Sequence, residues 1–135
     1  MQTFIKDVRQ LVKTPKMPFV IGVLGTGGFK DSTDRTPVVQ AQRAAAELPE
    51  FQGNVQAVET YVYYPLIADV LSSYVGRNRK NPKVTETDLY KKLKAELDIT
   101  VSNAGYHYMG NAPFHLIIGN AFAEAMVELM GNKEK

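Results

Sequence analysis

The apolar run PFVIGVL at residues 18–24 constrains the fold more than any other stretch of this sequence. It is apolar at nearly every position and rich in β-branched side chains, a pattern typical of a strand covered on both faces, as in a parallel sheet. Residues 37–48 then predict a helix, with Thr36 as N-cap and Pro37 at the first helical position. A shorter strand is predicted over residues 53–60. The order strand, helix, strand predicts an α/β fold.

The sequence shows only these two strands, which is a physical problem for a buried parallel sheet. A two-stranded sheet has two open edges and little area, whereas PFVIGVL calls for neighbours on both sides. We therefore expect a second copy of the chain, a partner protein or an absent N-terminal region to complete the sheet. Each of these predicts exposed apolar surface in an isolated monomer. The length of 135 residues predicts a single domain, residues 1–135.

Four further helices are predicted from apolar spacing and capping residues. They are residues 3–13, a segment ending near Gly76 with Pro65 at its first position, residues 84–97 with Thr85 and Asp88 spaced as in a capping box, and a last helix behind Asn111 with Pro113 just inside it.

Composition excludes several classes of function. Sixteen basic and fourteen acidic residues give a net charge of +2, too small to predict binding to nucleic acid through a long-range field. The chain has no cysteine, which excludes disulfides and thiolate chemistry. No apolar run approaches the ~20 residues of a membrane span, and the start MQTFIKDVRQ is amphipathic instead of resembling a signal peptide. We expect a soluble protein without membrane contact, and the sequence leaves its localisation open.

Both histidines lie in the segment NAGYHYMGNAPFH, residues 103–115. His107 is flanked by glycines and tyrosines in a loop before the last helix, where a general base is often displayed; the alternative is a surface histidine stacked on a tyrosine. His115 falls in the first turns of the helix, whose N-terminal field disfavours the imidazolium, and is interpreted as structural. The two are eight residues apart with no adjoining carboxylates, so no metal site is expected.

The glycines of IGVLGTGG follow a strand, but their spacing is GxxGxGG and not the GxGxxG of dinucleotide-binding proteins. A glycine-rich active-site or surface loop is the alternative reading. The basic residues of 77–83 lack interleaved aromatics and are interpreted as a solvated loop.

Three stretches together carry a resemblance: MPFVIGVLGTGG, AAAELPEFQGNVQAVET and SNAGYHYMGNAPFHLIIGNAFAEAMVEL. They resemble the C-terminal part of the sialate O-acetylesterase-like carbohydrate esterases of the SGNH hydrolase superfamily. The likeness is weak across residues 61–100. It implies a partial flavodoxin-like, SGNH-type three-layer fold with few parallel strands flanked by helices, completed by oligomerisation. It also implies hydrolysis of an acetylated carbohydrate, without a cofactor, by a serine activated by histidine.

His107 matches the family's catalytic histidine. The resemblance places Gly25, Thr26, Gly27 and Gly28 at the active-site rim, and we expect these residues and Asn103 to contact substrate. The usual acidic partner, three residues before the histidine, is replaced by Ala104. The nucleophilic serine belongs to N-terminal blocks that this chain does not contain, and none of the internal serines fits a nucleophile elbow; these are Ser32, Ser72, Ser73 and Ser102.

The sequence therefore suggests the C-terminal portion of a carbohydrate O-acetylesterase, with the general base but not the nucleophile, and nearly inert alone. Its partner would be either a further copy or the missing N-terminal portion. The alternative is a non-catalytic homodimeric α/β module in which the open flank of PFVIGVL has become a self-association surface.

Overall fold

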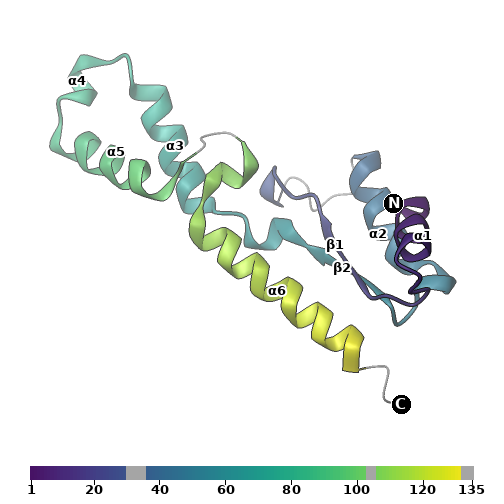
Figure 1. The fold of residues 1–135 in the computed structure, drawn as a ribbon. Coiled ribbons are helices and arrows are strands. Elements are labelled where there is room, and N and C mark those ends of the chain that lie inside the picture. The colour runs from purple at the N-terminus through teal and green to yellow at the C-terminus, as the bar shows by residue number, and fades with distance from the viewer. Residues whose placement is uncertain (30–35, 103–105, 132–135) are drawn as a thin grey trace.

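The computed structural model describes residues 1–29, 36–102 and 106–131, and it has an α/β architecture (Figure 1). Its helices are α1 (Gln2–Leu11), α2 (Pro37–Glu47), α3 (Leu66–Asn78), α4 (Pro82–Thr85), α5 (Asp88–Thr100) and α6 (Ala112–Gly131), and its strands are β1 (Phe19–Val23) and β2 (Val55–Glu59). Short 3-10 turns η2 (Pro49–Phe51), η3 (Thr60–Tyr63) and η4 (His107–Gly110) connect them.

The two strands form a parallel sheet in which Phe19 pairs with Val55 and Val23 pairs with Glu59. Helix α2 lies between them in the chain, as the crossover that parallel pairing requires. No third strand occurs in the part of the chain that the structure describes. The prediction of an α/β fold with only two visible strands is therefore confirmed. Within the described residues, no further strand pairs with the outer edge of β1 or of β2.

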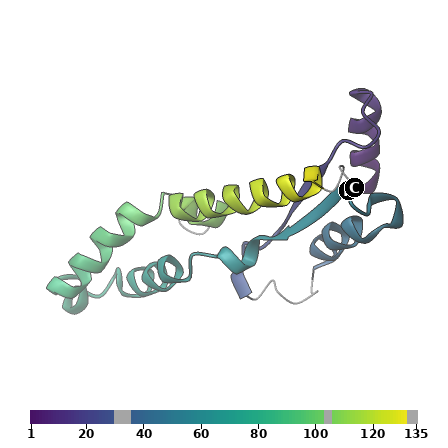
Figure 2. The ribbon, with the colours of Figure 1, turned by 90° about the horizontal axis from the view of Figure 1, so that it is seen from below.

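Helices cover both faces of this small sheet. On one face, residues from α1, β1, α2, η2 and β2 form a buried cluster, namely Ile5, Ile21, Ala45, Phe51 and Val55. On the other face lies α6, seen on the opposite side of the strands from α2 in Figure 2. There α6 approaches β1 so closely that a Cβ on Gly22 would be 2.7 Å from Cζ of Phe122. The sheet and helices α1, α2 and α6 together are called the body below.

Helices α3, α4 and α5 form an arm that projects from the body (Figure 1). The arm has its own buried cluster of Val75, Tyr90 and Leu97. Helix α3 ends at Asn78, near the predicted end at Gly76. Two sequence predictions are wrong here. Pro65 precedes α3 at the N-cap position instead of occupying its first helical position. Thr85 ends α4 instead of starting the next helix, and Thr87 caps α5 by accepting a hydrogen bond from Tyr90 N at 3.2 Å.

Much apolar surface is exposed. The accessible surface of the chain is 9207 Å², against roughly 7,000 Å² for a folded monomer of 15.0 kDa. Exposed large apolar side chains occur on the body and on the arm, including Leu11, Ile67, Ile99, Leu116 and Val127. No helix among the described residues combines the length and apolar character needed to cross a bilayer.

Candidate functional site

His107 lies at a small hollow beside the carboxyl ends of the two strands. The hollow has a volume of about 150 Å³. Its lining residues are Thr26, Tyr64, Tyr106, His107, Tyr108 and Met109. The structure thus brings together His107 and Thr26, two residues that the sequence predicted for one site. In open α/β sheets, ligands bind outside the carboxyl ends of the strands, which is where this hollow lies.

The backbone that carries His107 forms a left-handed turn. Four consecutive residues have positive φ: 47° at His107, 53° at Tyr108, 62° at Met109 and 58° at Gly110. For a residue with a side chain, this conformation costs roughly 1–2 kcal/mol. Such strain persists only where the surrounding structure enforces it, and it concentrates at functional sites.

Contacts on both sides hold the turn in place. Met109 is buried. Asn111, which follows the turn, accepts a hydrogen bond from Phe114 N at 2.9 Å and donates one from Nδ2 to Thr100 O at 3.1 Å. The predicted N-cap of the last helix is therefore confirmed. Because the same side chain also binds the end of α5, it fixes the turn against both the arm and the body.

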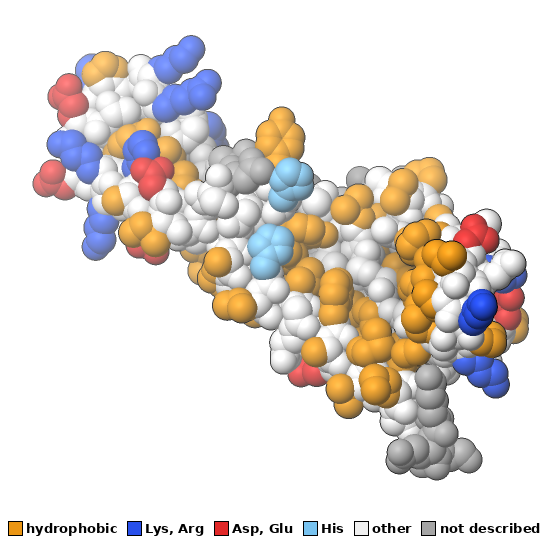
Figure 3. All heavy atoms as spheres, in the orientation of Figure 1, with side chains coloured by type: hydrophobic (Ala, Val, Ile, Leu, Met, Phe, Trp, Pro, Cys, Tyr) orange, Lys and Arg blue, Asp and Glu red, His pale blue; other side chains and the backbone are white. Residues whose placement is uncertain are grey.

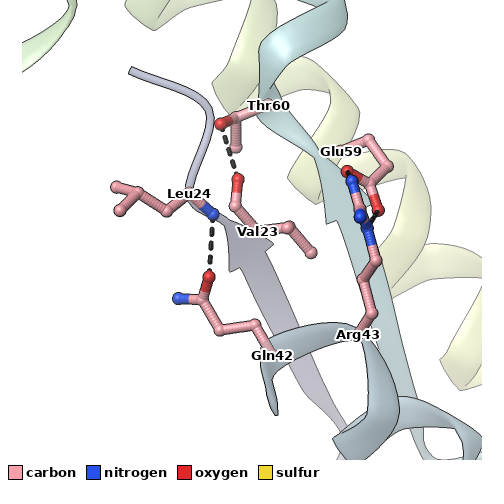
Figure 4. Close-up of polar contacts among 6 residues, drawn as sticks. All are labelled: Val23, Leu24, Gln42, Arg43, Glu59 and Thr60. Carbon is pink, nitrogen blue, oxygen red and sulfur yellow. Dashed lines mark hydrogen bonds and ion pairs between the residues drawn. The ribbon is translucent and has the colours of Figure 1, made fainter. Parts of the chain in front are cut away.

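Tyr108 ties the turn to both strand ends. Its hydroxyl oxygen accepts a hydrogen bond from Gly25 N at 2.9 Å and lies 2.5 Å from Thr60 Oγ1. Thr60 Oγ1 in turn donates to Val23 O at 2.6 Å (Figure 4). Since the threonine proton is used on the Val23 carbonyl, the tyrosine must donate to Thr60 Oγ1. The result is a directed chain of hydrogen bonds from Gly25 through Tyr108 and Thr60 to Val23. The Tyr108 ring also stacks on Phe114, with centroids 4.1 Å apart.

The glycines predicted to contact substrate have structural reasons to be glycine. A Cβ on Gly25 would lie 2.3 Å from Tyr61 N and 2.8 Å from Thr60 Oγ1. Gly28 has a φ of 61°, and a Cβ there would lie 2.7 Å from the Tyr64 ring. Gly25 and Gly28 are buried and Gly27 is half-buried, whereas Thr26 is exposed and lines the hollow. Asn103 lies outside the described residues.

Other polar groups at the carboxyl ends of the strands are engaged with one another. Leu24 N donates to Gln42 Oε1 at 2.9 Å (Figure 4). The carboxylate of Glu59, the last residue of β2, accepts two hydrogen bonds from Arg43. Oε1 accepts from Nε at 2.5 Å, and Oε2 accepts from Nη2 at 2.8 Å. This two-point ion pair occupies both carboxylate oxygens of Glu59. We therefore do not assign Glu59 as an acidic partner of His107.

Among the described residues, neither a serine nor a carboxylate lines the hollow. Ser102 Oγ donates to Gly110 O at 3.0 Å, and Ser72 and Ser73 lie on α3 in the arm. Ser32 and Ala104 lie outside the described residues. Within the described ranges, no group of three or more histidine, aspartate or glutamate side chains could hold a metal ion.

The remaining predicted and missed residues can also be placed. His115 is exposed on α6, with its ring edge-on to Phe114 at 5.2 Å, and it does not line the hollow. The His107 and Tyr106 rings are 6.4 Å apart and tilted by 48°, which is not a parallel stack. Sequence reasoning missed Tyr64 and Tyr108. The crowding of tyrosines around His107 was the available signal for Tyr108, but nothing local indicated its bonding partners.

The pKa values of Arg9, on α1, and Glu50, in η2, are both lowered by their surroundings. Burial lowers the pKa of the Arg9 guanidinium, and the charge of Glu50 opposes this shift. Arg9 donates to Met17 O and to Asn54 Oδ1, both at 2.6 Å, which makes its role structural. Hydrogen bonds from Lys6 and then Gln2 lower the pKa of Glu50.

The fold and site define an α/β protein with a histidine-bearing hollow at the carboxyl ends of a two-stranded parallel sheet. Comparison of the chain with models of known protein families, with curated proteins and with solved structures gave no match.

Proposed function

We propose that this chain acts as the C-terminal portion of an SGNH-type carbohydrate O-acetylesterase in which His107 is the general base. One observation carries the proposal: His107 and Thr26 of the glycine-rich loop, about 80 residues apart in the sequence, line one hollow at the carboxyl ends of parallel strands. The strained left-handed turn that presents the imidazole supports it further, because strain of this kind marks functional sites.

In this proposal the nucleophilic serine comes from another polypeptide segment. His107 accepts the serine proton as the serine oxygen bonds to the acetyl carbonyl carbon. The bond from that carbon to the sugar oxygen then breaks, and the imidazolium returns its proton to the departing oxygen. Water releases acetate from the serine in a second round, with His107 again acting as the base. The exposure of His107 leaves its ring accessible to such a segment.

The small size of the hollow agrees with a site that needs another wall. Its volume of about 150 Å³ is below the range of roughly 300–1,000 Å³ that is usual for small-molecule sites. A segment that carries the serine and packs against an unpaired strand edge would enlarge and close it. By itself the chain is expected to show almost no ester hydrolysis, because none of the described residues that line the hollow with His107 is a serine.

The decisive experiment supplies the nucleophile by fusion to this chain. The N-terminal blocks of a sialate O-acetylesterase-like enzyme would be fused ahead of Met1, and hydrolysis of p-nitrophenyl acetate would be measured. We expect activity in the fusion, a loss of at least ~10²-fold with His107→Ala, and little change with His115→Ala as the matched histidine control. A fusion that is folded by circular dichroism but has the same rate after His107→Ala would rule out the proposed role.

The second candidate function is a non-catalytic homodimeric module. The observation in its favour is the sheet, whose outer edges have no strand partner among the described residues, together with the large exposed apolar surface. Light scattering after size exclusion separates the two. An inert, tight dimer that gains no activity in the fusion favours the module, whereas a fusion whose activity requires His107 favours the esterase.

A further inference from the structure

Helix α6 is apolar on two opposite faces. Its inner face lies against β1, β2 and η3 and buries Phe114, Ala121, Ala125 and Leu129. A helix that covers one face of a sheet normally turns polar side chains outward. On α6 the outward side is instead largely apolar (Figure 3). This side faces solvent in the monomer, so packing against the sheet does not explain its apolar character.

The outward residues follow a regular spacing of four, three, four and three. They are Leu116, Asn120, Ala123, Val127 and Met130, and this set is called the outer stripe. All five are exposed, with Leu116 at 76%, Val127 at 69% and Met130 at 56%. At about 100° per residue, the stripe lies diametrically opposite the inner face.

Little charge covers the outer stripe. Residues Ala112–Gly131 contain no lysine or arginine, and their only acidic residues are Glu124 and Glu128. Both are engaged: Glu124 Oε1 accepts from Asn120 Nδ2 at 2.7 Å, and Glu128 Oε2 accepts from Gln56 Nε2 at 3.1 Å. The stripe is therefore not a solvated face in which isolated apolar residues alternate with charges.

We propose that a second copy of this chain packs on the outer stripe, with the two α6 helices parallel and in register about a twofold axis. Alternation of four and three is the spacing of a coiled-coil seam. It places Asn120 and Val127 at a positions, and Leu116, Ala123 and Met130 at d positions. A β-branched residue at a with leucine at d favours two parallel helices, and a single asparagine at a fixes their register.

The asparagine identifies the occupant as another copy in the parallel orientation. Each Asn120 faces its own symmetry mate across the twofold axis, and the amide has a second N–H and a carbonyl oxygen with which to bond there. An antiparallel copy would set Asn120 against a d residue, and every d residue of the stripe is apolar. The amide would then lack a partner across the seam.

The stripe is short, which sets the strength of the dimer. From Leu116 to Met130 it spans about 21 Å of helix. Because the sheet already holds α6 folded, pairing carries no cost of helix formation. The contact remains below a standard interface of about 1,600 Å², so we expect a reversible dimer. This inference is independent of ester hydrolysis, and it uses a helix face and not the strand edge.

The test is sedimentation velocity of the intact chain over a dilution series. We expect the mass to approach twice that of the monomer at high concentration and to fall on dilution. Val127→Lys should shift the midpoint of the monomer–dimer equilibrium to at least ~10-fold higher protein concentration, since the dimer would bury the lysine charge in the seam. Ile99→Lys is the matched control, because Ile99 is 85% exposed on α5 and lies off the stripe. A chain that stays monomeric throughout, or a dimer that Val127→Lys leaves unchanged, overturns the proposal.

Cysteine crosslinking tests the orientation, and the absence of native cysteine makes it clean. Leu116→Cys and Met130→Cys, each alone, should form disulfide-linked dimers under mild oxidation, because parallel helices bring each end of the stripe beside its own copy. Ile99→Cys should not. An antiparallel pair would crosslink only when the Leu116→Cys and Met130→Cys chains are mixed, and that pattern would overturn the parallel register. Circular dichroism would confirm that each variant is folded.

Discussion

The body and the arm build their cores in different ways. The body cluster unites Ile5 of α1 with Val55 of β2 and with residues from the elements between them. The arm cluster of Val75, Tyr90 and Leu97 lies entirely within α3 and α5. The body therefore depends on contacts between segments distant in the sequence, and the arm on contacts between neighbouring helices. Distant contacts require closure of long loops before they contribute any stability.

The difference extends to how each region orders its backbone. In the body, strand ends and the His107 turn are joined across 83 residues by the Gly25 to Tyr108 hydrogen bond. In the arm, ordering is local: Asn81 and Thr87 each cap the helix that follows them. The candidate site therefore depends on the body's long-range contacts, with Asn111 as its link to the arm.

Replacing one glycine of each region with alanine is the strongest test of this comparison. Gly25→Ala forces a Cβ to within 2.3 Å of Tyr61 N, where backbone must move. We expect a loss of about 3 kcal/mol in the free energy of unfolding of the body. Gly76→Ala, in the arm, meets open space inside a helix and should stabilise α3 by about 0.5–1 kcal/mol.

Native-state hydrogen exchange measures both effects region by region. After Gly25→Ala, amide protection should fall across β1 and β2 while the amides of α5 keep most of theirs. Equal losses of protection in body and arm would mean that the two cores unfold as one unit, contrary to the comparison.

Tyr108→Phe should lower the free energy of unfolding of the body by less than Gly25→Ala does, and its effect should be centred on the candidate site. The change removes the acceptor of Gly25 N and the donor to Thr60 Oγ1 while keeping the ring that stacks on Phe114. Loss of a partner for a buried N–H costs about 1–2 kcal/mol. Urea unfolding followed by circular dichroism measures the loss, and the NMR signals of His107 should shift more than those of His115. Unchanged His107 signals would show that the turn does not need this hydrogen bond.

The sequence predicted what local patterns encode and missed what depends on distant partners. Strand β1, strand β2, helix α2 and the Asn111 cap followed from apolar runs and capping residues. The left-handed turn could not be predicted, because positive φ is uncommon for every residue with a side chain, including histidine, and of the four residues only Gly110 gives a strong signal for it. The need for glycine at position 25 likewise arises from β2's continuation into η3, at Thr60 and Tyr61.

Thr87→Ala gives the smallest expected destabilisation and sharpens the comparison from the side of the arm. The sequence placed the cap at Thr85. In the structure Asn81 caps the separate helix α4, which ends at Thr85, and Thr87 caps the next helix, α5. Loss of the Thr87 hydroxyl should therefore destabilise α5 by about 1 kcal/mol. Thr85→Ala, two residues away, is the matched control and should cost much less. Hydrogen exchange at the first amides of α5 distinguishes them, and because capping is local, protection in β1 and β2 should stay at the wild-type level in both variants. If Thr85→Ala proved the more damaging change, the helix would begin where the sequence had placed it.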